Sequence, residues 1–291
     1  MSNIVKIDRL AIIGVGLIGG SFALALKQAG AVREVLGVGR TMASLMLAKE
    51  RGLIDRAVGF AEAGEADCIL LAMPVGETAA VLTQLAPHLK PGAIVTDAGS
   101  TKANVIAAAR ASLGARHSDF VPGHPIAGSE QSGPAAAHAD LFQHKKVVLT
   151  PDSDTRVEAL SVVRALWETT GAQVEILDAE LHDRVFAAVS HLPHLAAFAL
   201  VDELAQRADG DTYFHFAASG FRDFTRIAGS SPEMWRDIAL ANREAVLVEL
   251  DAYVAALQSL RRGLDSNDAG ALLATFSRAR VARERWIKMK D

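Results

Sequence analysis

Cysteine is nearly absent from this 291-residue chain, which has a single one, Cys68. One cysteine excludes a disulfide within the chain and a cysteine-rich zinc site. Because Cys68 lies in the apolar run CILLAM, we expect its thiol to be buried. A reducing compartment, the cytoplasm, fits this usage.

Basic clusters and long apolar runs are also lacking. No block of Lys and Arg stands out and the net charge is −4, so we expect neither nucleic acid nor a membrane surface as a main partner. Ala11–Leu26 is uncharged, but four glycines interrupt it and it is shorter than the roughly 20 apolar residues that a spanning helix needs. Asp8 precedes this stretch and no clear cleavage site follows, which argues against a signal peptide.

The same stretch, AIIGVGLIGGSFALAL, predicts a strand, a tight turn and a helix in the order that a dinucleotide-binding fold requires. In its G-x-G-x-x-G pattern, Gly14 makes the turn, Gly16 lets a pyrophosphate approach the backbone, and Gly19 lets helix and strand pack closely. The helix that starts at Leu17 and Ile18 offers free N–H groups to the phosphates. We therefore expect these five residues to bind a dinucleotide.

An acidic residue that this fold usually has is missing. An Asp or Glu about 20 residues after the glycines normally binds the ribose 2′-hydroxyl. Here that place holds Gly39, followed by Arg40 and Thr41. A guanidinium and a hydroxyl would bind a 2′-phosphate that a carboxylate would repel, so the sequence favours NADP over NAD. The alternative is that Arg40 is a solvated surface residue and both cofactors are used.

Two further predicted strands end in residues suited to a ligand site. The first runs into Met73 and Pro74, and Pro74 turns the chain at the carboxyl edge of the sheet, where open α/β folds bind ligands. The second, Ala93–Asp97, is followed by Ser100. Taken alone, Ser100 is better explained as the N-cap of a helix that starts near Thr101.

His124 is the candidate catalytic residue. It stands between a glycine and a proline in GHPIAGSE, Gly123 to Glu130, after an apolar strand and before a Gly-Ser loop. Such a position is poor for a core residue, and His is the commonest general base near neutral pH. No second His or carboxylate lies nearby at metal-ligand spacing, so we expect no metal. A buried core histidine remains the alternative.

Strand-like runs end near Leu177, and helical periodicity takes over from Asp178. The sequence therefore predicts an α/β dinucleotide-binding domain of Rossmann type over residues 1–177. An all-α domain is predicted over residues 178–291.

The helical part carries three further candidates. His191 and His194 are three residues apart and share a helix face, with Pro193 expected to kink or loosen the helix between them. A metal pair would need another ligand, so we expect one His to be buried and hydrogen-bonded and the other to face a pocket. Arg226, between Phe residues and a Gly-Ser loop, suits a carboxylate clamp because its planar fork makes two charged hydrogen bonds.

Long helices with apolar faces close the chain. Ser231 predicts the N-cap of a helix that can run to about Arg262, and a final helix is expected from Asp268 to Lys288. Such helices suggest burial against a second copy, and we expect a homodimer.

Five motifs in this order, GVGLIGGSFALAL, TDAGSTK, GHPIAGSE, SHLPH and FRDFTRIAGSSPEMW, resemble the prephenate/arogenate (cyclohexadienyl) dehydrogenase family over nearly the whole chain. The resemblance implies a Rossmann domain followed by a helical domain that dimerises. It also implies oxidative decarboxylation of a small cyclohexadienol to a phenol in tyrosine biosynthesis, with hydride passing to NAD(P). No chorismate mutase-like or regulatory segment is seen, so we expect the minimal monofunctional form.

The resemblance also assigns roles to individual residues. His124 is implied to accept a hydrogen bond from the ring hydroxyl, and Ser100 to orient that histidine and the hydroxyl. His194 is implied to line the substrate pocket and Arg226 to bind a substrate carboxylate. The remaining two, at the pocket rim, are Glu130 and Trp235.

Two other functions fit parts of the sequence. A dehydrogenase of the β-hydroxyacid type would need a catalytic Lys at the start of its helical domain, and Asp178 to His194 contains none. A non-catalytic NADP-binding regulator would not need His124, Ser100 and Arg226 together. The sequence does not choose between prephenate and arogenate, although Glu130 could pair with the ammonium of arogenate.

Overall fold

The computed structural model describes residues 5–129 and 131–289. It divides into two compact units, Met1–Arg243 and Glu244–Asp291. The first contains both the α/β part and the helices that follow it. All the described candidate residues therefore lie in one unit.

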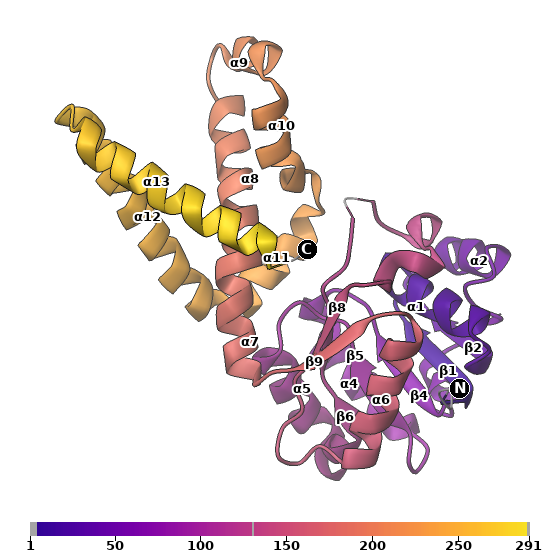
Figure 1. Cartoon of the computed structure of the whole chain (residues 1–291). Coiled ribbons are helices and arrows are strands. Elements are labelled where there is room, and N and C mark those ends of the chain that lie inside the picture. The colour runs from indigo at the N-terminus through magenta and orange to yellow at the C-terminus, as the bar shows by residue number, and fades with distance from the viewer. Residues whose placement is uncertain (1–4, 130, 290–291) are drawn as a thin grey trace. The chain divides into compact units, whose positions relative to one another are not determined.

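A six-stranded parallel sheet forms the centre of the described α/β part (Figure 1). In spatial order its strands are β3 (Arg56–Ala57), β2 (Val32–Val38), β1 (Ile7–Ile13), β4 (Cys68–Leu71), β5 (Ile94–Asp97) and β6 (Phe120–Val121). The strand order reverses between β1 and β4, and open α/β folds bind ligands at the carboxyl ends of the strands at such a point. This is the Rossmann-type architecture that the sequence predicted.

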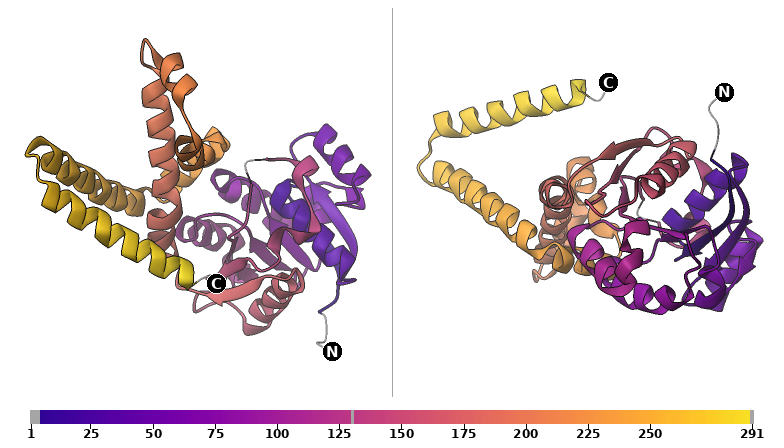
Figure 2. Two further views of the ribbon diagram at one scale, coloured as in Figure 1. Left: turned by 45° about the horizontal axis from the view of Figure 1, so that its top comes forward. Right: turned by 90° about the horizontal axis from the view of Figure 1, so that it is seen from below.

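Helices cover both faces of this sheet (Figure 2). Along β1, Leu10 and Ile12 pack into one core while Ala11 and Ile13 pack into the other, because successive strand residues face opposite sides. The first core includes residues of α1 (Leu17–Gln28), α2 (Met42–Glu50) and α6 (Val157–Thr169). The second includes residues of α3 (Phe60–Ala63), α4 (Thr78–Leu85) and α5 (Ala103–Leu113).

A smaller sheet holds the candidate histidine. Its strands are β7 (Gly123–Pro125), β8 (Lys146–Leu149) and β9 (Gln173–Ile176), with β7 antiparallel and β9 parallel to β8. His124 pairs in register with Val148. Because β7 starts two residues after β6 ends, the main sheet sets its position. The α/β part also contains short 3-10 segments between its helices and strands: η1 (Val75–Glu77), η2 (Ala86–His88), η3 (Gly114–Asp119), η4 (Pro134–Ala136) and η5 (Ala139–Phe142).

Helices follow β9. The first run consists of α7 (Ala179–Phe186), a π-helical turn (Ala187–His191) and α8 (Leu192–Ala205). The π turn ends two residues before Pro193, near the place where the sequence predicted a disturbed helix. By length and composition alone this run could cross a membrane, but it contains ionisable residues that hydrogen-bond within the site described below.

The first unit continues through α9 (Gly210–Phe216), α10 (Ser219–Thr225), η7 (Arg226–Gly229) and α11 (Pro232–Ala241). Ser231 caps α11 as predicted, accepting a hydrogen bond from the backbone N–H of Met234. The prediction of one helix up to Arg262 was wrong, because Asn242 leaves helical geometry at φ −108° and ψ 31°. Its buried side chain hydrogen-bonds to Asp183 and lies beside His191, as described below.

The second unit is a helical hairpin, formed by α12 (Arg243–Asp265, from Glu244 on) and α13 (Ala269–Lys288). Asp268 caps α13, in agreement with the predicted start of the last helix. Gly263 packs beneath Leu272 at the turn. Apolar side chains remain exposed on both helices, among them Leu257, Leu264, Leu273, Phe276 and Val281.

Candidate functional site

The glycine turn joins β1 to α1 with the geometry that its sequence pattern requires. Gly14 has a φ of +94°, and a Cβ there would lie 2.7 Å from the carbonyl carbon of Ala72. A Cβ on Gly19 would lie 2.6 Å from the carbonyl oxygen of Gly14, so only glycine lets the helix approach the strand. A Cβ on Gly16, by contrast, would meet no described atom within 4 Å.

This turn fits the pyrophosphate of a dinucleotide. Gly16 is the N-cap of α1, and no described side chain caps the helix in its place. The backbone N–H groups at Leu17 and Ile18 begin the helix, where partial positive charge favours a phosphate. Met73, at the end of the neighbouring strand, lies against Gly14, and Pro74 caps the short helix that follows.

Arg40 and Thr41 follow β2 at the same edge of the sheet. Thr41 is the N-cap of α2, and its hydroxyl accepts a hydrogen bond from the backbone N–H of Ser44 at 3.2 Å. Arg40 is exposed, and its Nη1 lies 3.4 Å from Oε1 of Glu77. Such an exposed ion pair is weak, so Arg40 can exchange this carboxylate for a phosphate.

His124 is buried in β7, and its ring contacts α7. Its Nδ1 lies 2.8 Å from Nε2 of His182, and its ring meets the edge of Phe186 with centroids 4.8 Å apart. Burial, with smaller contributions from His182 and Lys102, lowers the pKa of His124 well below the usual 6.5. The imidazole is therefore neutral at physiological pH.

Asp183 continues this contact into the start of α5. Nδ1 of His182 lies 2.8 Å from Oδ1 of Asp183. The same carboxylate accepts hydrogen bonds from the backbone N–H groups of Lys102, at 2.8 Å, and Ala103, at 2.9 Å. Burial alone would raise the pKa of Asp183, but these hydrogen bonds outweigh it and lower the pKa. The prediction that Ser100 caps this helix was therefore wrong: the cap is a carboxylate from α7.

A second buried network fixes the backbone beside His124. Nζ of Lys102 donates to the carboxylate of Asp97 and, at 2.6 Å, to the carbonyl of Gly123. Oδ1 of Asp97 in turn accepts from the backbone N–H of Gly123 at 3.0 Å. Burial lowers the pKa of Lys102, and the charge of Asp97 opposes that shift. Lys102 is fully buried, so it supports β7 rather than a ligand.

His191 is the buried member of the predicted histidine pair. Its Nδ1 lies 3.1 Å from Nδ2 of Asn242, which also donates to the carbonyl of Asp183 at 2.8 Å. Burial lowers the pKa of His191 to about 4, and the main chain of Ser100 lies close enough to oppose that shift slightly. Asn242 thus leaves its helix in order to join α7 and the π turn.

His194 is the half-buried member. Its Nδ1 lies 2.8 Å from the carbonyl oxygen of Ser190, and its ring stacks on Trp235 with centroids 3.5 Å apart. Burial lowers its pKa, and the charge of Arg226 adds to this, which places the exposed guanidinium in its electrostatic neighbourhood. Glu130 lies outside the described residues.

The structure thus gathers most of the catalytic and substrate-binding candidates into two linked groups. His194, Trp235 and Arg226 form one, and His124 with its partners forms the other. Asn242 contacts Asp183 and His191, and the ring of His191 lies 6.1 Å from that of Trp235, which connects the two groups. Five further members of these networks, all polar and buried, were not predicted from the sequence: Asp97, Lys102, His182, Asp183 and Asn242.

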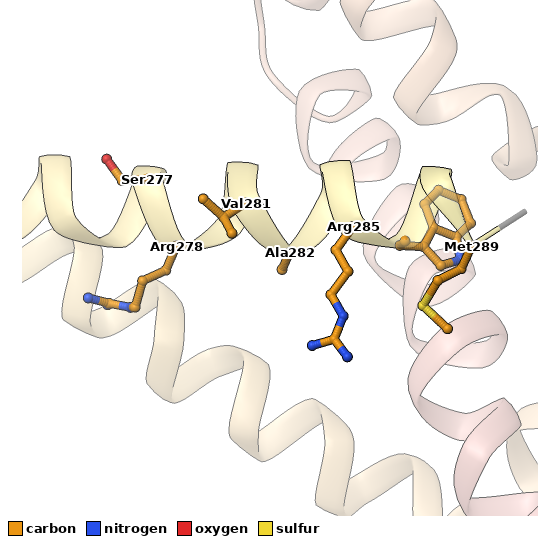
Figure 3. A pocket seen from close by; sticks show the side chains of 7 residues that line it. Ser277, Arg278, Val281, Ala282, Arg285 and Met289 are labelled. Carbon is orange, nitrogen blue, oxygen red and sulfur yellow. The ribbon is translucent and has the colours of Figure 1, made fainter. Parts of the chain in front are cut away.

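Two other features have no place in this site. His117, Asp152 and Asp154 lie close enough together to hold a metal ion, but Arg110 donates to both carboxylates and supplies the positive charge. In the second unit, a hollow of about 570 Å³ lies along α13 (Figure 3). It is lined mainly by apolar side chains of that helix, with Arg278 and Arg285.

Comparison with known proteins matches both parts of the chain. Residues 22–176 match the nucleotide-binding domain of prephenate dehydrogenase, and residues 178–278 match its dimerization domain. The cyclohexadienyl dehydrogenase of Zymomonas mobilis is 37% identical over 278 residues, which cover 94% of each chain.

Solved structures agree. The prephenate dehydrogenase of A. aeolicus, in complex with hydroxyphenyl propionate and NAD+, is 36% identical with a TM-score of 0.90, over 97% of this chain and 99% of that one. The arogenate dehydrogenase of Synechocystis is 32% identical with a TM-score of 0.79, over 96% and 99%. The N-terminal part is accordingly a nucleotide-binding domain and the helical part a dimerisation domain, and the chain belongs to the prephenate dehydrogenase family.

Proposed function

We propose that this protein catalyses the NAD(P)-dependent oxidative decarboxylation of prephenate, arogenate or both. The observation that carries the proposal is the neutral, buried imidazole of His124, whose backbone is fixed at the carboxyl edge of a dinucleotide-binding sheet. A neutral imidazole can accept the hydrogen of a substrate hydroxyl. The family to which the chain belongs supports this substrate class.

The proposed reaction uses the chain's residues in simple roles. The bound cofactor supplies a hydride acceptor. As the hydride leaves the carbinol carbon, Nε2 of His124 accepts the hydroxyl proton and so prevents positive charge from building up. Loss of CO₂ then returns an electron pair to the ring, and His124 returns the proton to the phenolic oxygen. Formation of the aromatic ring makes the sequence effectively irreversible.

The remaining candidates position the substrate. Arg226 binds a carboxylate, and the stacked rings of His194 and Trp235 form a wall beside it. Ser100 lies in the loop that follows β5, and its hydroxyl orients His124 and the hydroxyl of the substrate. Correct orientation alone can be worth several kcal/mol of the barrier.

The cofactor is proposed to be NADP in preference to NAD. No acidic residue follows β2 at Gly39, Arg40 and Thr41, and the guanidinium of Arg40 is exposed at that edge. The hydroxyl of Thr41 already caps α2, so Arg40 carries most of this preference.

We also propose that the protein is a homodimer formed through its helical part. The nucleotide-binding domain is proposed to end at residue 177 and the helical substrate and dimerisation domain to begin at residue 178. The apolar side chains that the helical hairpin leaves exposed support this, as does the family's dimerization domain. A cytoplasmic enzyme of a biosynthetic pathway fits the single, buried cysteine.

The test is a side-by-side assay of prephenate and arogenate with NADP and NAD, following the absorbance of the reduced nicotinamide. We expect turnover of at least one substrate, and a higher kcat/KM with NADP than with NAD. Tight NADP binding without turnover of either substrate would instead support a nucleotide-binding regulator.

A further inference from the structure

The carboxylate of Asp183 sets the direction of the side-chain hydrogen bonds that run through His182 to His124. Two of its partners, the backbone N–H groups of Lys102 and Ala103, can only donate. These two donors lower the pKa of Asp183, so the carboxylate is ionised and can only accept, and its third partner, Nδ1 of His182, must carry a proton. The backbone N–H groups at the start of α5 thus place the proton of the His182 ring on Nδ1.

The proton positions on the two rings then follow by counting. His182 is fully buried among Asp183, His124 and the ring of Phe186, with Lys102 and Asp97 as the other charged groups near it. A neutral imidazole has one N–H, so Nε2 of His182 is an acceptor. It lies 2.8 Å from Nδ1 of His124, which must therefore be the donor. This leaves a lone pair on Nε2 of His124.

We propose that His182 and Asp183 are positioning residues that hold His124 in the tautomer with a proton on Nδ1 and a free lone pair on Nε2. This proposal rests on the proposed function, because only that tautomer can accept the hydroxyl proton of a cyclohexadienol. When His124 takes that proton it becomes an imidazolium, and its Nδ1–H bond to His182 becomes a charge-assisted one. The negative charge of Asp183, on the far side of the His182 ring, stabilises the new positive charge.

The decisive variant is His182→Leu, which removes the acceptor while filling a similar volume. We expect kcat to fall about 100-fold or more, within the range that general acid–base catalysis provides, while KM changes by only a few-fold. His182→Gln offers a carbonyl oxygen that can accept from Nδ1 of His124, so we expect it to recover part of the lost kcat. His117→Leu is the matched control, because His117 is also buried and hydrogen-bonded to an aspartate, outside the site. It should alter stability but not kcat.

Nitrogen NMR of the histidine rings tests the tautomer without any substrate. In wild-type protein labelled with ¹⁵N-histidine, we expect Nδ1 of His124 to be protonated and Nε2 not, with the signal identified by its loss in His124→Asn. A His124 protonated on Nε2 would overturn the proposal, as would a folded His182→Leu enzyme with nearly unchanged kcat. Because this measurement needs no turnover, it remains decisive if His182→Leu does not fold. It also separates failure of this proposal from failure of the proposed function, in which the wild-type enzyme would oxidise neither substrate.

Discussion

The phosphate end and the imidazole end of the site are built from different materials. At the phosphate end, one βα turn presents backbone N–H groups, and its glycines exclude side chains. At the imidazole end, side chains from β7, α7 and the C-cap of α11 join backbone N–H groups at the start of α5 in a buried hydrogen-bond network. The first end has no group that titrates near neutral pH, whereas the second depends on protonation states. Binding and chemistry should therefore be separable by mutation and by pH.

The largest separation is expected at His124. Replacement by Asn removes the lone pair that accepts the hydroxyl proton but does not touch the glycine turn. We expect kcat to fall about 1,000-fold or more, while the Kd for NADP, measured by fluorescence titration or calorimetry, stays within two-fold of wild type. Near-wild-type turnover in this variant would show that the base lies elsewhere.

Acidification should weaken the imidazole end selectively. His124, His182 and His191 all have a lowered pKa because of burial, so the unfolded chain binds more protons than the folded one as pH falls below 6.5. The contribution of these histidines to the free energy of unfolding is therefore complete above pH 6.5. It is lost as the pH falls from 6.5 to their pKa in the folded protein. For His191, with a pKa of about 4, the loss amounts to about 3 kcal/mol over this window. Urea unfolding at a series of pH values measures it, and His191→Gln should reduce the slope.

For the same reason, we expect activity to persist at a lower pH than it would with a catalytic histidine of ordinary pKa. The lowered pKa of His124 keeps its imidazole neutral below pH 6.5. We expect the acid limb of kcat to lie below 6.5, provided that the assay pH remains within the range where the protein is folded. An acid limb above 6.5 would contradict the burial of this ring in the working enzyme.

Arg226 tests how substrate binding divides from chemistry. Replacement by Ala removes a charged, bidentate partner of a substrate carboxylate. We expect KM for the cyclohexadienol to rise about 10- to 100-fold, with a smaller fall in kcat and no change in NADP binding. The conservative variant Arg226→Lys should recover only part of the affinity, because an ammonium lacks the planar fork. An unchanged KM would move the carboxylate clamp to another residue.

These two ends also differ in how far the sequence could predict them. The glycine turn, the Rossmann-type domain that it indicates and the cap at Ser231 follow from residues close together in the chain, and the structure has them. The cap of α5 and the break at Asn242 were mispredicted because both depend on Asp183, a partner about 60 to 80 residues away. In the sequence, His182 and Asp183 are two adjacent polar residues of a predicted helix, and nothing near them indicates that they are buried. Only the packing of α7 against β7 and α5 turns that pair into a buried hydrogen-bond chain.

The smallest effect is expected at Arg40, at the cofactor end of the site. Arg40→Ala should weaken NADP about tenfold while leaving NAD unchanged, because only NADP has the 2′-phosphate that a guanidinium binds. Glu77 supplies the matched variant, since its carboxylate is the present partner of Arg40 and would compete with that phosphate. Glu77→Gln should therefore strengthen NADP by a few-fold, again without a change for NAD. Measured Kd values for both cofactors decide the matter. Equal losses for NADP and NAD in Arg40→Ala would mean that Arg40 supports the adenosine site generally, and the preference would then need another origin.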